Sequence, residues 1–92
     1  MTMSAQAVAR QLAISPQDLI RQAIQAFLRE QARFYNAERL KLCRKYGVSS
    51  LQEMDRLVAQ GKVDEEAILH DLQRVDFLTA KLRKIEELLE AA

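Results

Sequence analysis

The fold of this chain is decided by residues 15–47, which read SPQDLIRQAIQAFLREQARFYNAERLKLCRKYG. Ser15 is suited to cap a helix, because its hydroxyl can accept a hydrogen bond from a free backbone N–H group of the first turn. Pro16 fits the first helical position, and Asp18 lies at the positive end of the helix dipole. No helix breaker follows until Gly47, the residue type that commonly ends helices. The stretch therefore predicts one helix about 45 Å long.

This helix carries an apolar stripe along one side. Its members recur at intervals of three, four and seven residues, which is the pattern of an amphipathic helix. They are Ile20, Ile24, Phe27, Leu28, Phe34, Tyr35 and Leu42. A stripe of this length needs another helix, or another chain, to cover it.

The rest of the chain predicts three more helices. Ser50 followed by Glu53 is a capping-box pattern, and the three acids from Asp64 open a last helix that Gly61 separates from the one before. The last helix carries apolar residues seven positions apart, at Ile68, Val75, Leu82 and Leu89. The alternate positions of this heptad pattern hold Leu78 and Ile85, and Asp71 is its one polar break. The stripe is widened by Leu72, Phe77 and Leu88. The expected helices span about 4–12, 16–46, 51–60 and 64–90.

These elements predict an all-α fold in a single helical domain, residues 1–92. Two long antiparallel helices joined by a short helical elbow leave apolar faces uncovered, so we expect a homodimeric helix bundle with the short helices at its ends. The alternative is a monomeric bundle in which the short helices complete the core. The expected partner or dimer interface comprises Ile20, Ile24, Phe27, Phe34, Ile68, Leu72, Val75, Leu78, Leu82 and Ile85.

Composition excludes several classes of protein. The chain is 49% hydrophobic with two glycines and one proline, which suits a helical core and not an all-β fold. Cys43 is the one cysteine, so an internal disulfide is excluded, and Glu66 and His70 are at most two ligands of a metal. Phosphate loops and nucleophile motifs are absent from the sequence. We therefore expect a cytoplasmic protein that is not an enzyme, with no catalytic residue, cofactor, metal, membrane span or small-molecule substrate.

Charge is distributed unevenly along the sequence. Residues 1–48 hold eight Lys and Arg against three Asp and Glu, whereas residues 49–92 hold six against ten. The two halves either neutralise each other by packing or serve different partners. If the basic half binds nucleic acid, the expected contacts are Arg29, Arg33, Arg39, Arg44 and Lys45.

Two segments resemble a known family. Residues 12–31 are similar to the second-helix segment of ribbon-helix-helix antitoxins, with residues 4–12 in the place of their first helix. Residues 44–49, RKYGVS, resemble a segment that follows the long helix in many small prokaryotic antitoxin-like proteins. The resemblance implies a dimeric helix pair. The β-strand with which that family reads DNA has no counterpart before Val8, so no DNA-contacting residue is carried over.

The sequence thus leads to a hypothesis of a non-enzymatic, antitoxin-like interaction module. It would form a homodimer and bind a partner protein, such as a toxin, through its C-terminal helix. The alternatives are a nucleic-acid-binding helical dimer and a purely structural self-associating module. The sequence leaves open the identity of any partner, which apolar face is dimer core, whether DNA is bound, and whether Met1 is the native start.

Overall fold

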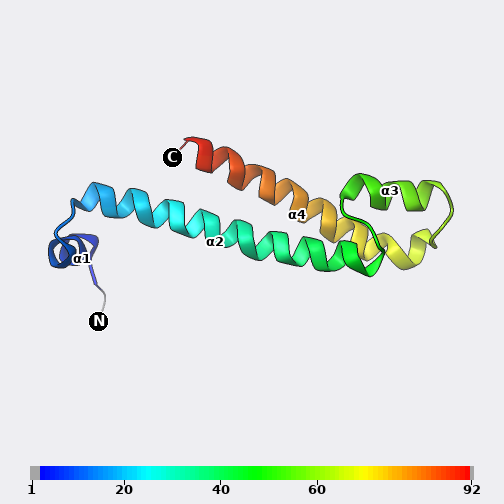
Figure 1. The fold of residues 1–92 in the computed structure, drawn as a ribbon, viewed down its shortest axis with the longest axis horizontal. Helices are drawn as coiled ribbons and strands as arrows, with labels where there is room; N and C mark the ends of the chain where they lie inside the picture. Colours follow the sequence, from blue (N-terminus) through cyan, green and yellow to red (C-terminus); the bar gives the residue numbers. More distant parts are fainter. Residues whose placement is uncertain (1–2, 92) are drawn as a thin grey trace.

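The computed structural model describes residues 3–91, and this part of the chain contains four helices and no strand. Figure 1 shows them in chain order. They are α1 (Ala5–Leu12), α2 (Pro16–Lys45), α3 (Leu51–Ala59) and α4 (Glu65–Ala91). The all-α class is confirmed, and each helix begins and ends within one residue of its predicted boundary. Within the described range, no helix combines the length and apolar character needed to cross a membrane.

Both ends of α2 follow from local chemistry. The Ser15 hydroxyl accepts a hydrogen bond from the Asp18 N–H at 3.0 Å, with Pro16 in the first turn. At the other end Gly47 has a φ of +69°, and the Val48 N–H donates back to the Cys43 carbonyl at 3.1 Å. That left-handed residue and six-residue loop are the usual way to satisfy the last carbonyls of a helix.

Serine caps also start the short helices. Ser4 accepts from the Ala7 N–H at 3.1 Å, and Ser50 accepts from the Glu53 N–H at 3.1 Å. The Ser49 N–H donates a hydrogen bond to the Glu53 carboxylate at 2.7 Å. A capping box would have the N–H of Ser50, one residue later, as the donor. The cap is therefore present, with a shifted second bond.

A small core forms where α2 ends and α3 and α4 meet. Cys43, Met54, Ile68 and Val75 are buried completely there. Further along α4, Leu78 and Ile85 are also buried. This core joins three helices. The connection between α2 and α4 takes part in it, because Met54 of α3 is one of its buried residues.

Polar contacts fix how α4 lies on α2. Asp71 Oδ2 accepts hydrogen bonds from Lys45 Nζ at 2.7 Å and from the Tyr46 hydroxyl at 2.6 Å, and we name these three residues the Asp71 clasp. Further on, the Arg74 guanidinium donates to the Glu38 carboxylate, with an Nη2–Oε1 distance of 2.9 Å. Partner residues thus step back along α2 as they step forward along α4, so α4 returns alongside the second half of α2 (Figure 1).

The molecule is long and thin. Its extents are 60 × 29 × 16 Å, and its radius of gyration is 19.1 Å. A compact domain of this size would have a radius of gyration of about 12 Å. The two short helices lie at opposite ends, with α1 against the start of α2 and α3 against α4 (Figure 1). They therefore do not gather around one core, as the monomeric bundle would require.

Candidate interaction surface

The start of α2 extends beyond α4. After Asp71, which pairs with Lys45, α4 has 20 residues left (72–91), whereas α2 has 29 residues before Lys45 (16–44). The difference of nine residues is about two and a half turns of helix. Figure 1 shows this uncovered segment between α1 and the C-terminus. Apolar side chains there have no α4 residue to pack against.

The exposed apolar side chains of α2 form one row. Their exposed fractions are 48% for Ile20, 50% for Ile24, 62% for Phe27 and 64% for Phe34. Three of them are spaced by seven residues, so they share one side of the helix. We name these four residues the α2 stripe. All four belong to the interface predicted from the sequence, and the single chain leaves them exposed.

The residues predicted for the interface on α4 are placed differently. Ile68, Val75, Leu78 and Ile85 are at most 4% exposed, and Leu72 and Leu82 are half-buried. The heptad seam of α4 therefore packs inside the chain, mainly against α2, and these four buried residues are not available to a partner. The physical reason is that α4 returns along its own α2 and uses its apolar seam there.

Three other apolar residues of α4 are exposed instead, namely Leu69, Phe77 and Leu88. Phe77 is 51% exposed and Leu88 is 44% exposed, and the sequence placed both in the apolar stripe of this helix. The Phe77 ring lies beneath the Arg74 guanidinium, 5.1 Å from the ring centroid. The signal that could have separated Phe77 and Leu88 was their spacing of eleven residues, which puts them together on the flank of the heptad seam.

The surface area of the chain is large for its mass. The accessible surface is 7018 Å² for 10.6 kDa. A compact monomer of that mass exposes about 5500 Å². The excess of about 1500 Å² on one chain is larger than the roughly 800 Å² that each partner contributes to a standard protein interface. The chain thus exposes enough additional surface to form one interface.

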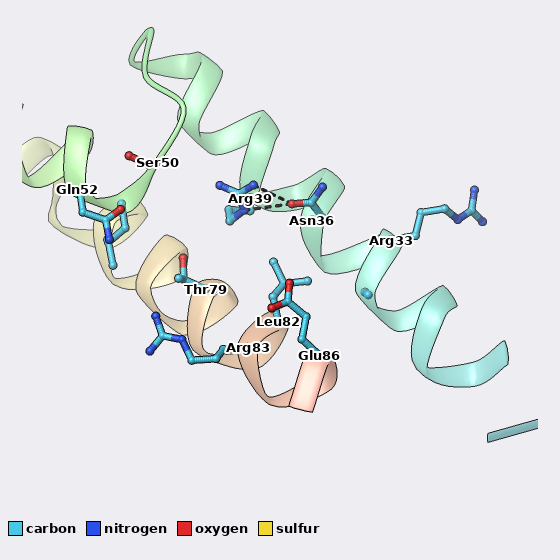
Figure 2. A pocket seen from close by; sticks show the side chains of 11 residues that line it. Arg33, Asn36, Arg39, Ser50, Gln52, Thr79, Leu82, Arg83 and Glu86 are labelled. Carbon is cyan, nitrogen blue, oxygen red and sulfur yellow. Dashed lines mark hydrogen bonds between the residues drawn. The ribbon is translucent and has the colours of Figure 1, made fainter. Parts of the chain in front are cut away.

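A groove of about 540 Å³ runs between α2 and α4 near the start of α3. Figure 2 shows that Thr79, Leu82 and Glu86 come from α4, while Asn36 and Arg39 come from α2. The Thr79 hydroxyl donates to the Val75 carbonyl at 2.7 Å, as is common within helices. The lining of the groove contains one carboxylate and no histidine or cysteine. The groove therefore presents a polar helix-packing surface, without a pair of groups arranged for acid–base or nucleophilic chemistry.

All five basic residues suggested for nucleic acid lie on α2. They are Arg29, Arg33, Arg39, Arg44 and Lys45. Arg33 binds Glu30 one turn earlier at 2.6 Å, while Arg39 binds Asn36 at 2.8 Å (Figure 2). Lys45 belongs to the Asp71 clasp. Three of the five thus have partners within the chain, and nucleic-acid binding stays an untested prediction.

The ionisable groups between α2 and α4 form hydrogen bonds that hold the two helices together. The pKa of Asp71 is held below its ordinary value by the hydrogen bond from Lys45 and then by the one from Tyr46. The same bond raises the pKa of Tyr46. The hydrogen bond from Arg74 lowers the pKa of Glu38. These hydrogen bonds stabilise the charged carboxylates that join α4 to α2.

No metal site is formed by the described residues. Within positions 3–91, no three His, Cys, Asp or Glu side chains lie close enough to hold an ion. Cys43 is buried in the core beside Met54, and His70 is exposed on α4. The strongest feature of the surface is therefore apolar, and it lies on α2.

Comparison with known proteins identifies a family. The model of the Uncharacterized protein MJ0235 family matches residues 1–91. A relative, Uncharacterized protein MJ0235 of Methanocaldococcus jannaschii, is 33% identical over 49 residues, which is 53% of this chain. The match covers 60% of the relative's own length. No solved structure matches the chain.

Proposed function

The chain belongs to the Uncharacterized protein MJ0235 family, and we propose that it acts as a non-enzymatic helical interaction module that forms a homodimer. The observation that carries this proposal is the α2 stripe. Four large apolar side chains on one side of a helix, all about half exposed or more, are unfavourable in water. A second copy offers the same stripe, as a two-fold interface requires.

Burial of the stripe supplies a useful but limited driving force. Each of the four side chains contributes roughly 1 kcal/mol when its exposed half is covered, or about 8 kcal/mol for two copies. Association costs at least about 4 kcal/mol in lost freedom. The net gain is small enough that every member of the stripe is needed for a stable dimer.

Sedimentation equilibrium tests the proposal. The chain should behave as a dimer of about 21 kDa, twice the 10.6 kDa of one chain, as its concentration approaches about 1 mM, the dissociation constant that a net gain of about 4 kcal/mol gives. Ile24→Asp should weaken the dimer at least tenfold, because the carboxylate would be buried at the interface. Gln22→Asp is the matched control, because Gln22 is exposed on another side of α2. A strict monomer, or equal effects of both substitutions, would contradict the proposal.

A second candidate function is antitoxin-like binding of a partner protein by α4. It is favoured by the exposure of Phe77 and Leu88 on the flank of the buried seam of α4. The mechanism would be occlusion, with these two side chains inserted in a groove of the partner. The test is co-purification with the protein encoded by the adjacent gene. Loss of that complex in Phe77→Ala is expected, and the absence of any complex or of protection from toxicity would refute the candidate.

A further inference from the structure

We propose that two copies of this chain pair through α2 helices that run in opposite directions and cross at Phe27. The uncovered start of each α2 then lies in the shallow angle between α2 and α4 of the partner subunit. This inference rests on the homodimer proposed above and specifies its direction and register. It follows from the face on which the exposed apolar residues gather and from the length of α2 that α4 leaves bare.

One face of the α2–α4 pair carries large exposed apolar side chains, with the Glu38–Arg74 ion pair among them. Glu38 follows Phe27 by eleven residues, or three turns, so it lies on the same side of α2. Glu38 binds Arg74, and Arg74 lies over the Phe77 ring at 5.1 Å. Leu88 follows Phe77 by eleven residues and shares its side of α4. The α2 stripe, Phe77 and Leu88 therefore face the same way.

The other face of the pair is polar. Asn36 follows Phe27 by nine residues, and Glu86 follows Phe77 by nine, which places each on the opposite side of its helix. Both line the groove between the two helices (Figure 2). The two faces of this thin molecule thus differ in character, and the apolar one is the face that a second copy covers.

The position of the crossing follows from the spacing of the stripe. Ile20 and Phe34 each lie seven residues from Phe27. When two α2 helices run in opposite directions about a two-fold axis at Phe27, that ring meets Phe27 of the partner subunit. Ile20 then meets Phe34 of the partner subunit, and the reciprocal contact repeats on the other side. This register pairs Ile20, Phe27 and Phe34 across the interface, and Ile24 lies between the levels of Ile20 and Phe27.

The direction of the pair follows from where α4 ends. If the helices ran in the same direction, the two bare starts of α2 would lie against each other, with both α4 helices ending before them. Running in opposite directions, each bare start lies against the second half of the partner's α2, where α4 is present. Leu88 and Phe77 then cover it from the side. This arrangement buries six exposed apolar side chains per chain instead of four. The two additional side chains matter because burial of the α2 stripe alone gives only a small net gain in free energy.

Single-cysteine cross-linking of the full chain tests both direction and register. A disulfide needs Cα atoms closer than about 7 Å. Phe27→Cys should therefore link to itself under mild oxidation, at least tenfold more than Gln22→Cys, a control at an exposed site on another side of α2. Ile20→Cys and Phe34→Cys should not link alone but should link when the two variants are mixed. The native Cys43 is buried and should not react.

Each outcome separates the two proposals. Self-linking of Ile20→Cys and of Phe34→Cys, in a protein that sediments as a dimer, would overturn the opposite-direction pair and leave the homodimer standing. A dimer in which neither Phe27→Cys nor the mixed pair links would overturn the register. If the Phe27→Cys substitution itself weakens association, the mixture of Ile20→Cys and Phe34→Cys still tests the register. A protein that is monomeric at every concentration would refute both proposals.

Discussion

The Asp71 clasp should stabilise the chain through a coupled pair of hydrogen bonds. Tyr46→Phe removes the 2.6 Å bond from the tyrosine hydroxyl to a carboxylate that is 13% exposed. A bond to a charged, mostly buried acceptor contributes about 1.5 kcal/mol to the free energy of unfolding. The 2.7 Å bond from Lys45 contributes less, because that side chain is 62% exposed and water competes for it. Asp71→Ala, which removes both bonds, should therefore cost about 2 kcal/mol.

Urea unfolding followed by circular dichroism measures these losses. In the double variant, which combines Tyr46→Phe with Asp71→Ala, the two losses should not add, because both substitutions remove the bond from the Tyr46 hydroxyl to Asp71. The coupling energy between the two residues should be about 1.5 kcal/mol. Additive losses, with coupling below about 0.5 kcal/mol, would show that the bond contributes nothing and would refute the reasoning.

The pH dependence of unfolding gives an independent check on the clasp. The pKa of Asp71 is lowered in the folded chain, so its contribution is fully present above the unfolded pKa of about 3.9. It is lost as the pH falls through the lower, folded pKa. Asp71→Asn should flatten the stability profile in that acid range, and an unchanged profile would contradict the assignment.

Three further substitutions test the fold. Ile68→Ala empties a completely buried core position and should lower the free energy of unfolding by about 3 kcal/mol; a loss below about 1 kcal/mol in urea unfolding would move Ile68 out of the core. Gly47→Ala should cost about 1 kcal/mol by the same measurement, because φ is +69° while nothing lies within 4 Å of the added methyl group; a stabilising effect would contradict the left-handed turn. Ser15→Ala should cost about 1 kcal/mol through the lost cap of α2, and thermal denaturation with no shift would argue against that cap.

Helix boundaries could be predicted from the sequence because they depend on neighbours. Ser15 meets the N–H group three residues ahead, and Gly47 completes a loop with residues just behind it. These contacts need no knowledge of the rest of the fold. The four helices were therefore predictable to within a residue.

The role of each apolar face was not predictable, because periodicity shows that a face is apolar without showing what covers it. The heptad of α4 was assigned to an interface with Ile68 and Val75, yet both are buried within the chain. Asp71 read as a break in that heptad, whereas its partners Lys45 and Tyr46 lie 25 or 26 residues earlier. The exposure of Ile20 and Ile24 depends on where α4 ends, and that of Phe27 and Phe34 depends on which side of α2 it covers. Both are properties of the three-dimensional arrangement.

The bare start of α2 has a consequence for motion. Among the described residues before residue 43, Ala9 is the one buried apolar side chain, so the far end of the molecule has little to hold it closed. Amide hydrogens of α1 and of the first turns of α2 should exchange with solvent quickly, through local opening that leaves the core around Met54 intact. Association would slow that exchange at the far end first. The molecule would thus carry a gradient of local stability along its length, with the least protected amides in the segment that a second copy would cover.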